Sequence, residues 1–245
     1  EFDGTALNDG NWQIATGGWN SSKVQNYYSN SGKNVSVSDG TLKLSAHYEP
    51  GLERGGKTYD FTSGFVESRD KQTWTYGYFE ARIKMPTNNG SLWPAFWMSP
   101  NKNIHGANPR SGEIDVMEAK THDKTFVAAD THWGTGSGRG EHSHSQGKTT
   151  VNDISEWHTY SVKWQEGRLE YYVDGVHHHT VDNFSAPNAT THPGPFNVPF
   201  YLRLNMAVGG TYLDPEHQDA HVAKDNFPAT MEVDYVRVYQ LDGKD

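Results

Sequence analysis

The sequence contains no cysteine, and none of its apolar runs approaches the length of about 18 residues that a membrane-spanning helix needs. The absence of cysteine excludes disulfide bridges, thiolate metal sites and a cysteine nucleophile. The N-terminus also lacks a basic segment followed by an apolar stretch, so we expect that any signal peptide has already been removed. A membrane partner is not expected.

Positive charge is scarce relative to negative charge. Lys and Arg number 21 against 30 Asp and Glu, which gives a formal net charge of -9. Proteins that bind nucleic acids depend on Lys and Arg to neutralise phosphates, so a nucleic-acid partner is not expected. By the same argument a heavily sulfated polymer is disfavoured, and a neutral polymer fits the charge balance better.

Hydrophobic residues alternate with polar ones wherever the sequence is regular. Leu42, Leu44 and Ala46 take alternate positions in one stretch, and the segment 79–85 alternates in the same way. This period of two predicts half-buried β-strands, and no stretch of about ten residues shows the period of a helix. Since 8 Trp, 13 Tyr and 10 Phe supply much of the apolar area, we predict an all-β sandwich or jelly roll of two packed antiparallel sheets, forming a single domain over residues 1–245.

Turn residues separate the predicted strands. Asp39-Gly40, Glu166-Gly167 and Asp174-Gly175 supply residues that tolerate positive φ, as hairpin turns require. The segments Gly134 to Thr150 and Asp182 to Pro199 are rich in Gly, Ser, Asn, Thr, His and Pro, so we predict both as long surface loops. Loops of this length often border a binding site.

The strongest chemical signal is the segment from Glu113 to Glu118. In a regular strand Glu113 and Asp115 share a face, and Glu118 lies on the opposite one. A β-bulge that absorbs Val116 or Met117 turns Glu118 to the side of the other two acids and leaves apolar residues for the core. We predict such a bulge, and with it a row of three acids on one surface.

A row of three carboxylates is unfavourable by itself, because like charges repel and raise one another's pKa. The same arrangement suits the hydrolysis of a glycosidic bond, which in a retaining mechanism needs an ionised carboxylate and a protonated carboxylic acid about 5 to 5.5 Å apart. A strand that merely exposes charges to solvent is the alternative. The absence of Lys and Arg between these acids favours the catalytic interpretation.

Motifs across the chain resemble glycoside hydrolase family 16, in particular its laminarinase-like members. The ExDxxE pattern that ends at Glu118 and the preceding WPAFWM segment at Trp93 to Met98 carry the resemblance. It extends over almost the whole chain through EFDG at Glu1 to Gly4, NVSVSDGTLKLSA at Asn34 to Ala46, YGYFEARIKMP at Tyr76 to Pro86, WHTYSVKW at Trp157 to Trp164, YYVDG at Tyr171 to Gly175, NMAVGG at Asn205 to Gly210 and FPATMEVDYVRVYQ at Phe227 to Gln240.

The resemblance implies a jelly roll of two curved sheets with a concave substrate groove. It further implies endo-acting, retaining hydrolysis of β-1,3-glucan or mixed-linkage β-1,3-1,4-glucan. Carried over by position, Glu113 is the nucleophile, Glu118 is the general acid/base and Asp115 is the assisting carboxylate between them. A polysaccharide partner and no cofactor for catalysis are expected as well. We expect the protein to be secreted or extracellular, with the periplasm and the cell surface as alternatives. We also expect a monomer.

Residues that bind the substrate are implied as well. The expected set is Trp93, Trp97, His132, Trp133, Asn20, Glu67 and Arg69. We expect only one or two of the three tryptophans to contact the glycan, since burial is the default for this residue. Asn20 as a turn residue, His132 as a strand histidine, and Glu67 with Arg69 as a surface ion pair are the alternatives. Phe65 departs from the arginine that many laminarinases have at its position.

The resemblance also implies a structural calcium, away from the reaction, with ligands from Glu1, the carbonyl oxygen of Gly40 and Asp234. A solvated Asp234 is the alternative. Other histidines, such as His142 with His144, lie in turn-rich sequence and are predicted as surface residues rather than metal ligands.

Two other functions remain open at this point. A family 16 galactanase that acts on agar, porphyran or carrageenan is one, because YGYFEARIK and MEVDYVRV also resemble those relatives. A non-catalytic, lectin-like glycan-binding module is the other, because jelly rolls serve both purposes. Three acids in register would have no use in such a module.

Overall fold

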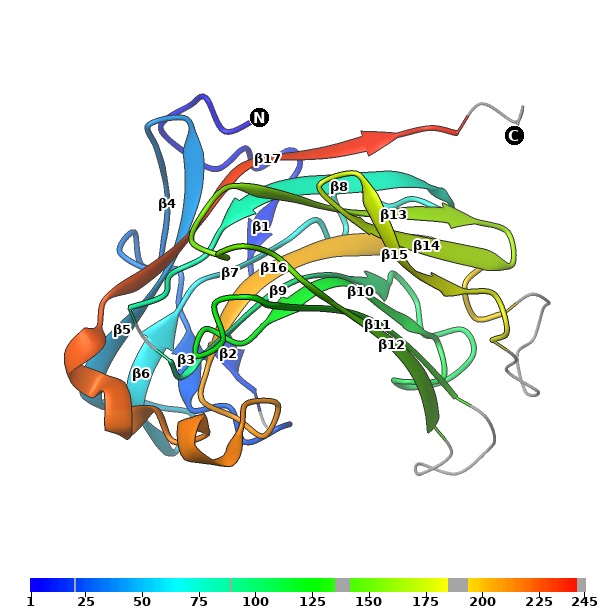
Figure 1. Cartoon of the computed structure of the whole chain (residues 1–245). Coiled ribbons are helices and arrows are strands. Elements are labelled where there is room, and N and C mark those ends of the chain that lie inside the picture. Colours follow the sequence, from blue (N-terminus) through cyan, green and yellow to red (C-terminus); the bar gives the residue numbers. More distant parts are fainter. Residues whose placement is uncertain (20, 89, 135–141, 185–193, 242–245) are drawn as a thin grey trace.

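The computed structural model describes residues 1–19, 21–88, 90–134, 142–184 and 194–241, which form two curved β-sheets packed face to face (Figure 1). The inner sheet has seven strands, and its concave face opens away from the outer sheet (Figure 1). In spatial order its strands are β1 (Gln13–Ile14), β7 (Phe65–Glu67), β16 (Phe200–Val208), β9 (Leu92–Pro100), β10 (Glu113–Ala119), β11 (Phe126–Gly134) and β12 (His142–Thr150).

The outer sheet covers the convex side of the inner one. Its strands are, in spatial order, β15 (Val176–Val181), β14 (Arg168–Val173), β13 (His158–Gln165), β8 (Gly77–Lys84), β17 (Ala229–Tyr239), β5 (Thr41–Arg54), β6 (Lys57–Ser63), β3 (Asn26–Tyr28) and β2 (Gly17–Gly18), with β4 (Val35–Ser38) paired to β5. Among the described strands only β3 and β6 pair in parallel. The predicted jelly roll of two antiparallel sheets is confirmed.

Helices play a small part in the described chain. Two short 3-10 helices, η1 (Pro215–His217) and η2 (Ala220–Asn226), precede β17. Within the described ranges, no helix has both the length and the apolar character needed to span a membrane.

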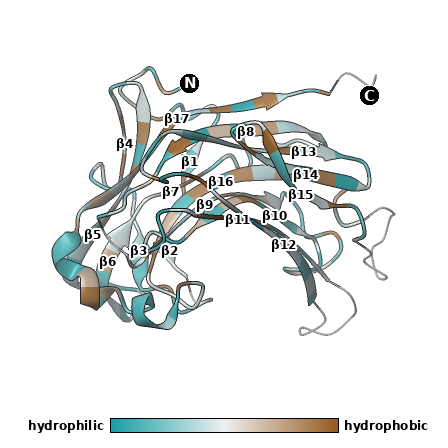
Figure 2. Ribbon diagram, viewed as in Figure 1, coloured by the Kyte–Doolittle hydropathy of each residue, from teal (hydrophilic) through white to brown (hydrophobic). Residues whose placement is uncertain are grey.

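The alternation of the sequence accounts for the core. β8 buries Phe79, Ala81 and Ile83 completely, while the residues between them are partly exposed. The hydropathy colouring alternates in the same way along β17 (Figure 2). The buried faces of the two sheets meet in one core, whose largest fully buried side chains include Trp164, Tyr160, Tyr171, Phe61, Phe79, Phe96, Phe196 and Phe200.

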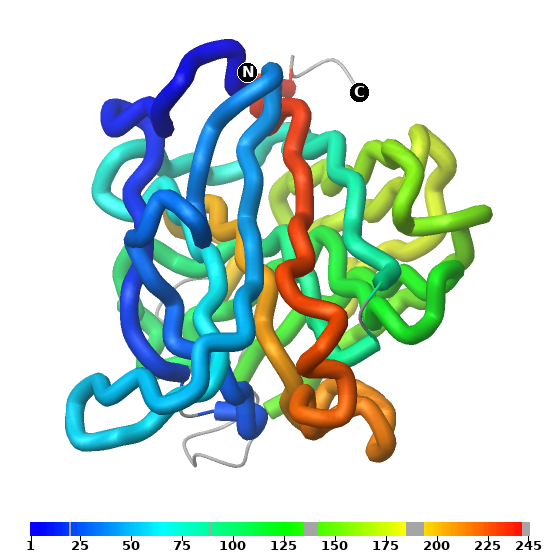
Figure 3. The backbone as a smooth tube through the Cα atoms, turned by 90° about the vertical axis from the view of Figure 1, so that its left-hand side faces the viewer, coloured from blue at the N-terminus to red at the C-terminus, as the bar shows by residue number. Residues whose placement is uncertain are grey.

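The predicted turns are confirmed, and they connect the hairpins of the outer sheet. Asp39 and Gly40 have φ angles of 55° and 76° between β4 and β5, and Asp174 and Gly175 have φ angles of 50° and 74° between β14 and β15. These left-handed conformations match the right-handed twist of the flanking strands. Figure 3 shows β17, near the end of the chain, running beside β5, so strands far apart in sequence close the sheet.

One loop prediction was wrong. The segment Gly134 to Thr150 contains β12, which pairs with β11 along its whole length. Polar and small residues suffice for this strand because it lies at the sheet edge, where one face turns to the groove and little apolar area is buried. In the other predicted loop, Asp182 to Pro199, the described residues contain no strand. Residues 135–141 and 185–193 lie outside the described residues.

Candidate active site

The concave face of the inner sheet carries a groove with a volume of about 1070 Å³. Side chains at alternate positions of neighbouring strands line it, because every second residue of a strand points to the same face. The central rows are Trp93, Ala95 and Trp97 on β9, Glu113, Asp115 and Glu118 on β10, and Asp130 with His132 on β11. The three predicted catalytic acids therefore share one surface.

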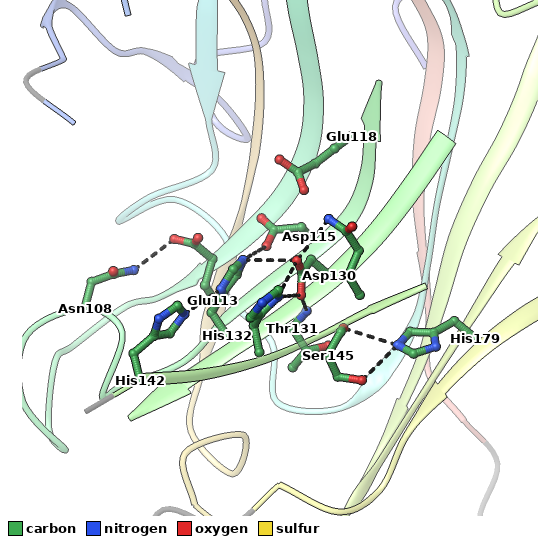
Figure 4. A network of polar contacts seen from close by, with 12 residues as sticks. Asn108, Glu113, Asp115, Glu118, Asp130, Thr131, His132, His142, Ser145 and His179 are labelled. Carbon is green, nitrogen blue, oxygen red and sulfur yellow. Dashed lines mark hydrogen bonds and ion pairs between the residues drawn. The ribbon is translucent and has the colours of Figure 1, made fainter. Parts of the chain in front are cut away.

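A β-bulge in β10 brings Glu118 into this row. Asp115 pairs with Trp97 of β9, and Met117 pairs with Phe96. The step along the chain is therefore two residues in β10 and one residue in β9, which defines the bulge. The register against β11 shifts over the same stretch. Met117 and the residue before it are both buried in the core. The predicted bulge is confirmed, and the three carboxylates lie along one side of β10 (Figure 4).

Burial raises the pKa of all three carboxyl groups. Loss of solvation is the largest cause for each, and repulsion from neighbouring acids adds to it. The pKa of Glu118 rises to about 8, the pKa of Glu113 to about 7, and the pKa of Asp115 well above its ordinary value. At neutral pH Glu118 is therefore the readier proton donor and Glu113 the more readily ionised group.

Polar contacts hold the two outer acids in place. The indole N–H of Trp93 donates to Glu118 Oε1 at 2.9 Å, and the Asn108 amide donates to Glu113 Oε2 at 2.9 Å. Both hydrogen bonds favour the ionised carboxylate, and the positive charge of Arg203 also lowers the pKa of Glu113. These contacts oppose the effect of burial and keep both pKa values near neutrality.

Asp130 is a fourth acid of the site, and the sequence reasoning missed it. It pairs directly with Asp115 across β11 and β10, is 2% exposed, and raises the pKa of all three catalytic carboxyl groups. The backbone N–H of Thr131 and the Gln146 amide donate to its carboxylate. Its spacing of two residues from His132 was the available signal, since that spacing places both on one face of a strand.

His132 borders the catalytic row, as the resemblance implied. Its Nε2 atom lies 3.4 Å from Asp115 Oδ2 and 3.6 Å from Asp130 Oδ2. Burial lowers the pKa of His132 in spite of these acids, so the ring is neutral at neutral pH. Contact of His132 with a substrate stays a prediction, whereas its contact with Asp115 is part of the structure.

The predicted groove tryptophans differ in their surroundings. Trp93 is half-buried, lines the groove and stacks on Tyr212 with ring centres 4.5 Å apart. Trp97 also lines the groove but is only 4% exposed, because the Arg203 guanidinium lies 4.0 Å from its ring centre. Trp19, which was not predicted, is half-buried at the groove and stacks on Trp97 with ring centres 5.6 Å apart. The most accessible platforms are therefore Trp93 and Trp19.

The placement of Trp133 in the groove was wrong. Trp133 is 6% exposed and packs in the core between the sheets, with its ring centre 6.5 Å from that of Phe184. Consecutive residues of a strand point to opposite faces, and β11 pairs with β12 without a shift at this point. Because His132 faces the groove, Trp133 must face the core.

The resemblance placed both Glu67 and Arg69 in the groove, but only Arg69 lines it. Glu67 is buried, accepts a hydrogen bond from the Gln13 amide at 3.0 Å and lies 3.3 Å from Arg203 Nε. Arg69 is exposed at the groove, with its guanidinium 5.9 Å from the Tyr201 ring centre. Glu67 is thus engaged by Arg203 instead of being free to bind a sugar. Arg203 was missed because its role depends on the pairing of β7 with β16, which no local pattern announces.

The expected subsite residue Asn20 and the expected calcium ligands remain to be placed. Asn20 lies outside the described residues. Glu1 accepts hydrogen bonds from Arg237, and Asp234 accepts one from Arg82 at 2.6 Å. Both carboxylates expected to bind calcium are paired with arginines in this structure, and the calcium site at Glu1, Gly40 and Asp234 stays a prediction.

The groove holds buried carboxyl groups whose pKa values differ, next to half-buried tryptophans. Such an arrangement is typical of a glycoside hydrolase. A family model described as beta-porphyranase A-D, GH16 domain, matches residues 1–241. The chain therefore belongs to glycoside hydrolase family 16.

Several similar proteins are glucanases. The chain is 37% identical over 262 residues to glucan endo-1,3-beta-glucosidase A1 of Niallia circulans, a match that covers 98% of this chain and 37% of that protein. It is 32% identical to a beta-glucanase of Rhodothermus marinus, over 98% of this chain and 83% of that protein. The X-ray structure of the laminarinase from Rhodothermus marinus superposes with a TM-score of 0.83 at 30% identity, covering 98% and 94% of the two chains. The chain thus spans well under half of the first relative and most of the second.

Proposed function

We propose that this protein hydrolyses internal linkages of β-1,3-glucan, and of mixed-linkage β-1,3-1,4-glucan, with retention of the anomeric configuration. The observation that carries the proposal is the bulge in β10, which puts Glu113, Asp115 and Glu118 on the floor of an open groove. A groove that is open along its length suits attack within a polymer. The glucanase relatives support the choice of substrate.

The two outer acids divide the chemistry. Glu113, the more readily ionised, attacks the anomeric carbon and forms a covalent glycosyl-enzyme, while protonated Glu118 donates its proton to the leaving oxygen. Glu118 then removes a proton from the water that releases the sugar. Asp115 lies between them, and through its contact with His132 it supports the orientation of the row.

A galactanase is the second candidate, because the matching family model is that of porphyranases. The test is incubation with laminarin, lichenan, agarose, porphyran and κ-carrageenan, followed by analysis of the products. Release of oligosaccharides from laminarin or lichenan is expected. Oligosaccharides from porphyran, agarose or carrageenan alone would assign the galactanase activity instead.

One substitution distinguishes an enzyme from a glycan-binding module. Glu113→Gln removes the nucleophile while keeping the size and hydrogen-bonding capacity of the side chain. We expect hydrolysis to be lost and glycan binding to persist. Equal turnover by this variant and the unchanged protein would defeat the assignment of Glu113, and absence of turnover in both would favour the module.

We further propose that residues 1–245 act as one catalytic domain, as a monomer, outside the cell. A polymeric substrate supports the external location, since such a polymer does not enter cells. The reaction needs no metal ion, so treatment with a chelator is not expected to lower the rate. Light scattering after gel filtration tests the monomer.

A further inference from the structure

Histidines from two strands converge on Asp130 at one side of the catalytic row. His132 of β11 pairs in register with His144 of β12. His142 lies two residues before His144 on β12, so the two histidines share a face of that strand. The three rings are stacked, with centres 5.2 to 5.8 Å apart. Figure 4 shows His132 together with Asp130, beside the acids of β10. His132 is ten or more residues away from His142 and His144 in the sequence. The pairing of β11 with β12 brings the three side chains together.

The distances around Asp130 fit one metal ion. Asp130 Oδ2 lies 3.0 Å from His144 Nδ1 and 3.6 Å from His132 Nε2. Ligand atoms bonded at about 2.0 to 2.2 Å to a tetrahedral Zn²⁺ ion lie about 3.4 Å from one another. The three side chains thus already present ligand atoms at spacings close to those of a metal site.

The catalytic acid Asp115 contacts the same histidine ring. Asp115 Oδ2 lies 3.4 Å from His132 Nε2, on the catalytic side of the ring. This oxygen is buried and has no hydrogen-bond partner among the described residues. Because Asp115 contacts His132, an ion bound to that ring would change the surroundings of a catalytic acid.

The donor set selects the class of ion. Two imidazole nitrogens and carboxylate oxygens suit Zn²⁺, Cu²⁺ or Ni²⁺, whereas Ca²⁺ and Mg²⁺ prefer oxygen ligands alone. Asp130 is buried and His144 is exposed, so an ion can enter the site from solvent.

We propose that Asp130, His132 and His144 bind a divalent transition metal ion such as Zn²⁺, and that the bound ion inhibits hydrolysis. The ion would occupy the groove wall and engage His132, the histidine that contacts Asp115 in the catalytic row. Only the inhibition rests on the proposed function; the binding does not. The metal and the glycan would therefore compete for this part of the groove.

Binding is tested by titrating ZnSO₄ into the full chain, stripped with a chelator, in a calorimeter. We expect one saturable site, and replacement of Zn²⁺ by Co²⁺ should give the visible absorption of a tetrahedral complex. His144→Ala should weaken binding by about tenfold or more, the range that loss of even an outer contact costs in metal sites. His177→Ala serves as the matched control, because His177 is exposed on β15 outside the groove lining.

Two readouts separate failure of this site from failure of the proposed function. Saturable binding that His144→Ala weakens and His177→Ala does not would support the site even if none of the glycans were cleaved. Equal binding by the two variants, or no saturable binding, would overturn it. The rate of each variant is measured with and without Zn²⁺ and compared with its own metal-free rate. Binding without any loss of rate would overturn the inhibition.

Discussion

Trp93 donates its indole N–H to Glu118 Oε1 at 2.9 Å, and the two side chains come from the adjacent strands β9 and β10. Burial raises the pKa of Glu118, and this hydrogen bond opposes the rise because it stabilises the ionised form. The balance between them sets the pH up to which the acid/base keeps its proton. A single donor thus helps to fix the alkaline limit of the active range.

Replacing Trp93 by Phe should move that limit upward. The ring that stacks on Tyr212 is kept, but the donor is lost, so the pKa of Glu118 rises further. A hydrogen bond to a charged group contributes about 1.5 to 3 kcal/mol, which corresponds to a shift of about one pH unit or more. The measurement is the pH profile of kcat/KM. Tyr212→Phe is the control, because it leaves the hydrogen bond between Trp93 and Glu118 intact. If the alkaline limb of the profile does not move in Trp93→Phe, the hydrogen bond does not set the pKa of Glu118.

Removing the charge of Asp130 should shift the profile in the other direction. Asp130 raises the pKa of both Glu113 and Glu118, so Asp130→Asn is expected to lower both values. The two limbs of the kcat/KM profile should then move to lower pH by about one unit. Asp123→Asn removes a similar charge outside the groove lining and should leave the limbs unchanged. A shift to higher pH in Asp130→Asn would contradict the electrostatic role of Asp130.

Local patterns predicted the parts of the site that depend on one strand. The period of two announced the strands, and the parity of Glu113, Asp115 and Glu118 required a bulge if all three acids were to share a face. The same parity rule, applied to β11, would have corrected the placement of Trp133 and found Asp130, because His132 fixes the face of both.

Features that depend on pairing between distant strands stayed hidden. Arg203 reaches Glu67 and Trp97 only because β16 lies between β7 and β9, and no window of sequence contains this relation. The histidines of β12 were read as surface residues because a polar edge strand has the composition of a loop. Their approach to Asp130 follows from the register with β11.

Arg203→Met tests the contact that this pairing creates. The substitution keeps an unbranched apolar side chain over Trp97 but leaves the buried Glu67 carboxylate without its cation. Loss of one partner of a buried ion pair costs about 3 to 5 kcal/mol, so we expect a decrease of that size in the free energy of unfolding, measured with urea. The double variant with Glu67→Gln should recover most of the loss. Equal destabilisation in the single and double variants would show that the pair is not the cause.

The buried acids also predict how stability depends on pH. The pKa of Glu118 is higher in the folded chain than in the unfolded chain, so folding takes up a proton between about pH 4.3 and pH 8. This contribution to stability is complete below that window and is lost as the pH rises through it. We therefore compare the effect of Glu118→Gln on the free energy of unfolding at two pH values. The change relative to the unchanged protein should be more favourable at pH 8.5 than at pH 5, by at least about 1 kcal/mol. Thermal unfolding at the two pH values measures this. The exposed Glu156→Gln is the control, and a benefit confined to acidic pH would reverse the assigned direction of the pKa.

The central claim is that the kink in β10 turns the carboxyl group at position 118 toward the same sugar as the one at position 113, close enough for double displacement. The most direct test is NMR of the reducing ends released in the first minutes of hydrolysis of a β-linked oligosaccharide. The β anomer should appear first and the α anomer only later, through mutarotation. Initial release of the α anomer would mean a single displacement by water and would contradict this arrangement of the two acids.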